Sequence, residues 1–284
     1  MKGNKLRVIP RLDIKGPNLV KGIHLEGLRV LGKPEYFAEY YYQNGADELF
    51  FQDTVASLYE RNSLSDIISK TAKKIFIPLT VGGGIRSIAD IRRALLSGAD
   101  KVCINTAAIK NPFFIKEATL KFGSSTIVVA IEAIKEYNGK YLAYTDNGRE
   151  YTGLDVFEWA QKVQELGAGE LVITSVDKEG TGEGFDVELV KKITELVDIP
   201  VIAHGGCKGS EDALNIFKNT EADGIAISSI LHYGCLDKIH SENDFEKEGN
   251  ISFLKSGNFF GKIKPCTILD IKETLHLNNI PVRL

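Results

Sequence analysis

The chain has 284 residues, of which 43% are hydrophobic and 26% charged, and this composition excludes a disordered or fibrous protein. Its 35 basic and 38 acidic residues are interspersed, so no basic face indicates a nucleic acid or an anionic membrane as partner. No apolar run approaches the roughly 18 residues that a spanning helix needs, and the N-terminus lacks the apolar core of a signal peptide. We expect a cytoplasmic protein without nucleic-acid or membrane partners.

Short apolar runs predict strands at 6–13, 47–53, 74–81, 100–105, 125–133, 169–176, 199–204 and 223–228. Between them, amphipathic stretches often closed by glycine predict helices at 34–45, 63–74, 87–98, 111–123, 153–167, 186–197 and 210–219. Near-continuous apolar strands joined by helices indicate a parallel sheet buried on both faces. Eight such units favour a single (β/α)8 TIM barrel over residues 1–284, with a doubly wound open sheet as the competing fold.

The two halves of the chain resemble each other. GADELF (45–50) aligns with GAGELV (167–172), IPLTVGGGIR (77–86) with IPVIAHGGCK (199–208), and GADKVCINTA (98–107) with EADGIAISSI (221–230). These offsets are nearly constant, which indicates a half-barrel repeat. The open sheet predicts neither this repeat nor a glycine-rich segment in the second half.

Two glycine-rich segments follow the predicted third and seventh strands, where a barrel of this kind carries its active face. Glycines let backbone N–H groups approach a phosphate closely, and hydroxyl or helix-start N–H groups after the fourth and eighth strands add donors. The alternative is that these residues only make turns and cap helices. We expect two phosphate sites, and hence a substrate with a phosphate at each end, built from Gly83, Gly84, Asn105 and Thr106, and from Gly205, Gly206, Ser228 and Ser229.

Asp13 ends the first predicted strand and Glu132 ends the fifth, at equivalent places in the two halves. Paired carboxylates across a barrel mouth suit general acid and general base catalysis. The alternative is a pair of solvated strand-end acids.

Strand alternation places Arg11 and Arg7 on the same face as Asp13, with Arg7 at the opposite end of the barrel. Charged residues also begin the second, fourth and sixth strands, as Glu48, Lys101 and Glu170. Two cations and two anions can close the barrel floor as a ring of ion pairs, although solvated bottom-face residues are the simpler interpretation.

These residues resemble a known family. IPRLDIK, LVKG, GADELFFQDTVAS, IPLTVGGGIRS, GADKVCINTAAIKNP, FGSSTIVVAIEA, GAGELVITSVDKEGT and IPVIAHGG are similar to the cyclase subunit of imidazole glycerol phosphate synthase (HisF). The resemblance covers about residues 6 to 232 and the last helix. It implies a barrel that takes ammonia from a HisH-type glutaminase at its bottom face and delivers it to a bis-phosphorylated ribonucleotide at its top, which is split and cyclised without a metal or other cofactor.

The resemblance also implies residue roles. Asp13 matches the first catalytic aspartate, and Glu132 stands where a second aspartate is expected. Lys21 matches the lysine of a mobile loop after the first strand. The phosphate-site residues match family positions at Gly84, Asn105, Thr106, Gly206 and Ser228. Arg7, Glu48, Lys101 and Glu170 match the four charges of the family's ammonia gate.

Several departures lie at the mouth. Glu132 adds one methylene to a catalytic position, and Arg11 replaces a usual cysteine, so the pKa of Asp13 should fall. His204 replaces a small residue before the second glycine pair, which narrows a phosphate pocket or adds a donor. An insertion at about 234–264 precedes the last helix.

This pattern resembles a branch of the family associated with surface polysaccharides, in which the barrel feeds ammonia to a sugar amidotransferase that makes acetamidino groups. We therefore expect an ammonia-delivery subunit of that branch, with the histidine-pathway cyclase as the alternative. A phosphosugar isomerase with the same half-barrel repeat is a third possibility, but it leaves the floor charges unexplained. A non-catalytic binding module leaves the phosphate loops and the acid pair unexplained.

Overall fold

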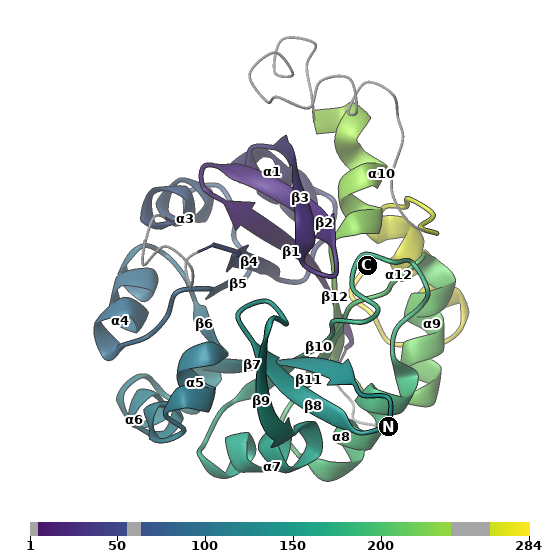
Figure 1. The fold of residues 1–284 in the computed structure, drawn as a ribbon. Coiled ribbons are helices and arrows are strands. Elements are labelled where there is room, and N and C mark those ends of the chain that lie inside the picture. The colour runs from purple at the N-terminus through teal and green to yellow at the C-terminus, as the bar shows by residue number, and fades with distance from the viewer. Residues whose placement is uncertain (1–4, 56–63, 240–261) are drawn as a thin grey trace.

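The computed structural model describes residues 5–55, 64–239 and 262–284 and confirms the expected (β/α)8 barrel (Figure 1). Within these residues, eight parallel strands form the wall: β1 (Arg7–Lys15), β4 (Leu49–Asp53), β5 (Leu79–Gly82), β6 (Lys101–Ile104), β7 (Ile127–Lys135), β10 (Glu170–Ser175), β11 (Val201–His204) and β12 (Gly224–Ile227). Each overlaps one of the apolar runs that predicted a strand.

The sheet closes on itself. β12 pairs with β1, with Arg7 opposite Gly224, and β7 pairs with β10, with Glu132 opposite Thr174. Every barrel strand therefore has a parallel neighbour on each side, and the doubly wound open sheet is excluded. The carboxyl ends of the strands meet at one end of the barrel, the mouth, and their amino ends meet at the other, the floor.

Helices surround the barrel in Figure 1. They are α1 (Pro34–Gln43), α3 (Ser65–Ala72), α4 (Ile88–Leu96), α5 (Thr106–Lys110), α6 (Phe113–Phe122), α7 (Val156–Glu165), α8 (Val187–Leu196), α9 (Ser210–Asn219), α10 (Ser229–Ile239) and α12 (Ile268–Leu277). Side chains of Ser87, Asp155 and Asp186 accept backbone N–H groups in the first turns of α4, α7 and α8, which satisfies donors that a helix start leaves without partners.

Two antiparallel hairpins interrupt the alternation of strands and helices, and the sequence patterns did not predict them. β2 (Asn18–Ile23) and β3 (Glu26–Gly32) follow β1, whereas β8 (Tyr141–Thr145) and β9 (Glu150–Asp155) follow β7. They occupy equivalent places in the two halves of the chain and lie on opposite sides of the barrel opening in Figure 1. Both hairpins continue barrel strands that carry a candidate catalytic acid.

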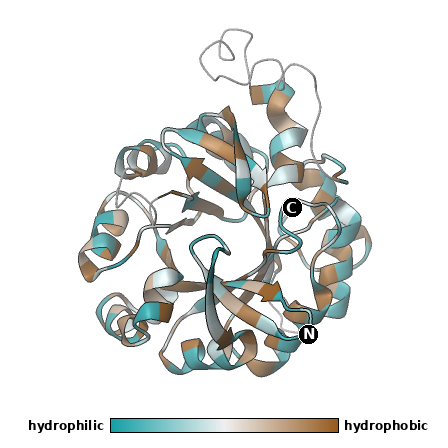
Figure 2. Cartoon of the chain, in the orientation of Figure 1, coloured by the Kyte–Doolittle hydropathy of each residue, from teal (hydrophilic) through white to brown (hydrophobic). Residues whose placement is uncertain are grey.

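The apolar core has two parts. The larger part lies between the strands and the helices, and Figure 2 shows hydrophobic residues on the strands and alternating colours along the surrounding helices. A smaller cluster alternates with it along the strands and so fills the barrel interior: Ile9, Phe50, Cys103, Val128, Val172, Ile202 and Ala226. An apolar layer therefore separates the floor from the mouth.

The expected insertion at 234–264 falls mostly outside the described residues. Residues 234–239 continue α10, and residues 262–266 return along the mouth, where the Lys262 and Lys264 N–H groups donate to the Thr181 and Lys208 carbonyls. Among the described helices, none has both the length and the apolar character that crossing a membrane requires.

Candidate active site

A ring of ion pairs closes the floor. Arg7 Nη1 lies 2.7 Å from Glu48 Oε1 and 3.2 Å from Glu170 Oε2. Lys101 Nζ lies 2.9 Å from Glu48 Oε2 and 3.0 Å from Glu170 Oε2. Each cation thus bridges both carboxylates, which are largely buried. Burial alone would lower the pKa of Arg7, but Glu170 and Glu48 outweigh it, so the net pKa is raised. The four residues therefore surround a common axis.

At the other end of the barrel interior, Asp13 is held between two cations. Arg11 Nε lies 3.0 Å from Asp13 Oδ1, and Lys21 Nζ lies 3.3 Å from Asp13 Oδ2, with all three side chains buried. Burial would raise the pKa of Asp13, but Arg11 and Lys21 reverse this and hold the pKa well below its usual range. The expected effect of Arg11 on Asp13 is thus confirmed, and Asp13 is ionised at neutral pH.

Lys21 lies in strand β2 rather than in the loop that the resemblance implies. This segment folds as a hairpin because Leu19 and Val20 are buried against the barrel and β2 pairs with β3. The Lys21 ammonium also forms a buried ion pair with Glu179, whose other carboxylate oxygen accepts the Leu25 N–H at 3.0 Å. Sequence reasoning missed Glu179, because a contact spanning 158 residues leaves no local signal.

Glu132 is buried on the opposite side of the mouth, in β7. Its Oε2 accepts a hydrogen bond of 2.8 Å from the Gly148 N–H, in the turn between β8 and β9. Burial raises the pKa of Glu132 to about 7, although the Gly148 N–H and the Arg11 guanidinium favour the charged form. The two candidate catalytic acids therefore have pKa values that their surroundings push in opposite directions.

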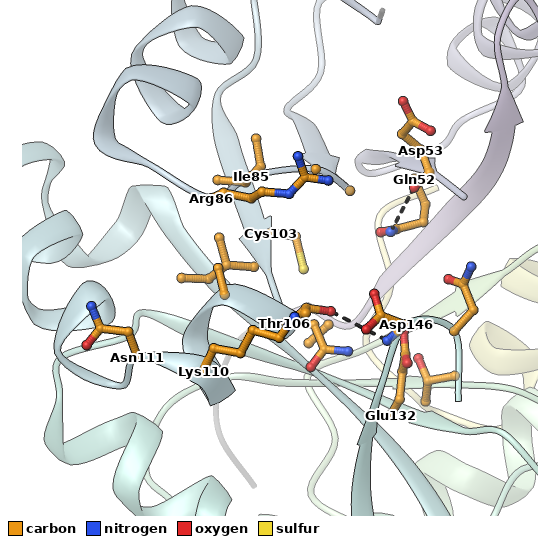
Figure 3. A pocket seen from close by; sticks show the side chains of 18 of the residues that line it. Gln52, Asp53, Ile85, Arg86, Cys103, Thr106, Lys110, Asn111, Glu132 and Asp146 are labelled. Carbon is orange, nitrogen blue, oxygen red and sulfur yellow. Dashed lines mark hydrogen bonds between the residues drawn. The ribbon is translucent and has the colours of Figure 1, made fainter. Parts of the chain in front are cut away.

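A cavity of about 300 Å³ occupies one half of the mouth, and its wall includes Gly83, Gly84, Asn105, Thr106 and Glu132 (Figure 3). The structure thus brings the first predicted phosphate site together with one candidate catalytic acid. A side chain at Gly83 would clash, because its Cβ would lie 2.2 Å from the Asp53 carbonyl oxygen, and its φ of +91° is in the region that favours glycine.

The cavity has lining residues that sequence reasoning did not select. Figure 3 shows Arg86 and Lys110 near one end of it, and Gln52 and Asp53 across from Glu132 and Asp146. The two cations follow the predicted phosphate segments closely in sequence, and their position suits a phosphate group. That proximity is the signal that could have identified them.

The second predicted phosphate site is nearly closed. Gly205, Gly206, Ser228 and Ser229 line a hollow of only about 20 Å³, together with Glu179 and His204. Gly205 repeats the geometry of Gly83, since its φ is +97° and its Cβ would lie 2.6 Å from the Ser175 carbonyl oxygen. The Ser228 hydroxyl, expected to face a phosphate, instead donates to the Arg11 carbonyl at 2.9 Å.

His204 accounts for part of this closure. Its Nδ1 lies 3.2 Å from Arg11 Nη1 and 3.1 Å from Thr174 Oγ1. Because a guanidinium only donates, Nδ1 is the acceptor and the ring carries its hydrogen on Nε2. Burial, aided by Arg11, holds the pKa of His204 well below its usual range, so the ring is neutral. Asp13 does not line the larger cavity, whose wall on that side is formed by Arg11 and Thr174.

Comparisons with known proteins agree with this architecture. A family model described as "Histidine biosynthesis protein" matches residues 7–237. The chain is 58% identical over 203 residues to the imidazole glycerol phosphate synthase subunit HisF of Legionella pneumophila, which covers 72% of this chain and 96% of that protein. It is 42% identical over 298 residues to the subunit of the same name from Methanococcus vannielii, with 98% of each chain covered.

A third relative, the imidazole glycerol phosphate synthase subunit HisF of Lactococcus lactis subsp. cremoris, is 46% identical over 239 residues, with 83% of this chain and 92% of that protein covered. All three relatives are named as synthase subunits, so the expected acetamidino-sugar branch and its sugar amidotransferase partner find no support. The chain belongs to the histidine biosynthesis family, as a homologue of imidazole glycerol phosphate synthase subunit HisF.

Proposed function

We propose that this chain is the cyclase subunit of an imidazole glycerol phosphate synthase and receives ammonia from a separate glutaminase at the barrel floor. One observation carries the proposal: the ring of Arg7, Glu48, Lys101 and Glu170 closes one end of a barrel whose other end holds Asp13 and Glu132, with an apolar interior between them. The names of the relatives support it.

The apolar interior suits the passage of neutral ammonia. Ile9, Val128 and Val172 belong to the layer between floor and mouth, and a charged ammonium ion would lose its hydration there. Neutral ammonia loses hydrogen bonds to water there but avoids the much larger cost of burying a charge. The ring of ion pairs at the floor is then the point of entry: an ammonium ion that arrives there gives its proton to solvent or to a carboxylate of Glu48 or Glu170, and neutral ammonia continues into the barrel.

The acid pair suits proton transfer at the mouth. Glu132, with a pKa raised to about 7 by burial, exchanges a proton near neutral pH, whereas Asp13 is held ionised and becomes an effective proton acceptor only when Arg11 and Lys21 no longer pair with it. The substrate's phosphates would lie at the Gly83–Gly84 and Gly205–Gly206 segments, on opposite sides of these acids. Because Lys21 of β2 and Arg11 of β1 cover Asp13, both the β2–β3 hairpin and the Arg11 side chain must move before a substrate reaches this carboxylate.

The floor end of the barrel also offers a surface for a protein partner. Phe76 precedes β5, and Leu96, Leu120 and Leu277 end or nearly end their helices at the floor, all with at least 80% of their surface exposed. Beside Phe76 lies a hollow of about 360 Å³ whose wall includes Pro78 and Asp100. Exposed apolar side chains that are scattered singly are common on protein surfaces, but Phe76 beside this hollow offers an apolar anchor of the kind that protein interfaces use. We assign this surface to the glutaminase.

Genetic complementation tests the proposal. Expression of this chain, with its glutaminase, should restore growth without histidine to a strain that lacks its own cyclase subunit, and the Asp13→Asn variant should not. Absence of growth with soluble, folded protein would contradict the proposal.

A second candidate function is ammonia delivery with little cyclase activity. The ion pairs that cover Asp13 and the hollow of only about 20 Å³ at the second phosphate segment favour it. It predicts no complementation but glutamine-dependent ammonia release from the complex with the glutaminase. The complementation strain and the ammonia-release assay together therefore distinguish the two candidate functions.

A further inference from the structure

The turn between β8 and β9 extends over the barrel opening in Figure 1 and contributes Asp146 and Asn147 to the wall of the larger cavity. Asp146, Asn147 and Gly148 have successive φ angles of 53°, 62° and 76°, a left-handed path that Asn and Gly adopt readily. The turn is thus a defined structure placed beside Glu132.

Asn147 ties this turn to the opposite side of the cavity. Its side-chain amide lies 2.8 Å from the Thr54 carbonyl oxygen, just beyond the end of β4. A carbonyl only accepts, so the amide nitrogen must be the donor. Thr54 is itself fixed, because its N–H and hydroxyl both donate to the Ile14 carbonyl, at 3.0 and 3.1 Å. The turn is therefore anchored to the extended part of β1 and to β4.

The next residue of the turn contacts the candidate catalytic acid. The Gly148 N–H donates to Glu132 Oε2 at 2.8 Å, and a Cβ at Gly148 would lie 2.9 Å from a methyl group of Val176. Because Asn147 and Gly148 are adjacent, the tether to Thr54 fixes the direction of the Gly148 N–H. We infer that Asn147 is a positioning residue for Glu132, an inference that rests on the proposed function of this site.

The groups around Glu132 make its pKa sensitive to how Asn147 holds the turn. Arg11 from β1, the Asn105 amide from the end of β6 and the Gly148 N–H favour its charged form, whereas burial and Asp146 disfavour it. Cys103 of β6 also faces it, as a thiol whose pKa burial raises to about 12. If the tether is lost, the Gly148 donor is no longer held on the carboxylate, and the pKa of Glu132 should rise.

The test compares Asn147→Gly with Asn138→Gly in the full chain. Glycine adopts the left-handed conformation at 147 readily and removes the side-chain amide that reaches Thr54. Asn138 is an exposed asparagine in the turn at the other end of β8, where its side chain accepts the Lys140 N–H at 2.9 Å. The readout is a pH titration of glutamate side-chain ¹³C resonances, with the Glu132 signal identified by its loss in Glu132→Gln.

We expect Asn147→Gly to raise the midpoint of the Glu132 titration by about one pH unit and Asn138→Gly to leave it unchanged. The pH profile of cyclase turnover should shift in the same direction. An unchanged midpoint in Asn147→Gly, or an equal shift in both variants, would overturn the inference. A shifted midpoint in a chain without cyclase activity would instead uphold the inference about Glu132 and contradict the proposed function, so the two failures are distinct.

Discussion

Arg11 and Asp13 form a buried ion pair within a single strand, with Arg11 Nε 3.0 Å from Asp13 Oδ1. The two residues point to the same face of β1 because strand side chains repeat with a period of two. The guanidinium also lies 5.4 Å from the centre of the Phe50 ring, which fixes it from below. The carboxylate that the family resemblance marks as catalytic is therefore held in its ionised form by its own strand.

Replacing this cation should destabilise the protein. Arg11→Met leaves Asp13 with Lys21 alone and should lower the free energy of unfolding by about 3 kcal/mol at pH 7, because it removes one partner of a buried ion pair. The folded pKa of Asp13 lies below its ordinary 3.8, so its stabilisation is present above pH 3.8 and is lost as pH falls through the folded value. In Arg11→Met the folded pKa of Asp13 should lie closer to 3.8, so the pH range over which this stabilisation is lost should be narrower.

Urea unfolding at pH 7 measures the loss of stability, and a series from pH 5 down to pH 2 follows the acid loss. Arg93→Met is the control, since Arg93 pairs with Asp90 at 3.4 Å on helix α4 with about half of its side chain exposed. That variant should change stability by no more than about 0.5 kcal/mol. Equal losses in both variants would contradict the role assigned to Arg11.

The raised pKa of Glu132 predicts a pH-dependent cost to the native state. Its folded pKa of about 7 exceeds the ordinary 4.5, so the native state binds this proton more tightly than the unfolded state does. The contribution of Glu132 to the free energy of unfolding of the wild type therefore falls as pH rises from 4.5 to about 7. Glu132→Gln removes that loss and should be more stable than wild type above pH 7, by up to about 3 kcal/mol.

Thermal or urea unfolding at pH 5 and pH 8 gives the comparison, with Glu158→Gln on the exposed face of α7 as the matched control. Cyclase turnover in Glu132→Gln should fall by about a hundredfold or more, as expected for loss of a general acid or base. A difference in the free energy of unfolding between Glu132→Gln and wild type that stays constant with pH would be inconsistent with a pKa near 7 for Glu132.

The floor ring predicts a selective effect on glutamine-driven activity. Lys101→Met keeps the side-chain length but leaves Glu48 and Glu170 bridged by Arg7 alone. We expect turnover driven by glutamine in the glutaminase complex to fall relative to turnover driven by ammonium salt, and stability to fall by about 1–3 kcal/mol. Lys162→Met, which breaks an exposed pair with Glu165, should alter neither. Equal ratios of the two activities in Lys101→Met and wild type would exclude a role in ammonia transfer.

His204 predicts unequal phosphate sites. The imidazole lines the small hollow at Gly205 and Gly206, whereas the larger cavity at Gly83 and Gly84 is open. Calorimetric titration of the wild type with inorganic phosphate should show one stronger and one weaker site. His204→Ala should tighten the weaker site about tenfold, or about 1.4 kcal/mol, by making room for the anion. If the affinity of the weaker site for phosphate is the same in His204→Ala as in the wild type, His204 does not restrict this site.

The barrel was predictable because local patterns and topology agree. Apolar runs such as 169–176 match β10 closely, and the repeat between 45–50 and 167–172 already argues against an open sheet. The hairpins were missed because their strands mix charged and polar with apolar residues and so form no continuous apolar run. One signal was present: Asp146-Asn147-Gly148 between two β-prone runs is typical of a hairpin turn.

The site was predictable only in part. Arg7, Glu48, Lys101 and Glu170 follow from strand starts and alternation, and the structure joins them in one ring. The pairing of Lys21 with Glu179 depends on how a hairpin from the first half packs on a loop of the second. Such a contact is fixed by tertiary packing and burial, which one sequence does not reveal.

The central claim is that this chain performs the cyclisation at its mouth. The direct measurement is turnover of the bis-phosphorylated ribonucleotide with ammonium salt by the purified wild-type chain and by Asp13→Asn. We predict that the wild type forms imidazole glycerol phosphate and that Asp13→Asn forms it at least about a hundredfold more slowly. Substrate binding without product formation by the wild type, or equal rates in the two proteins, would contradict the account.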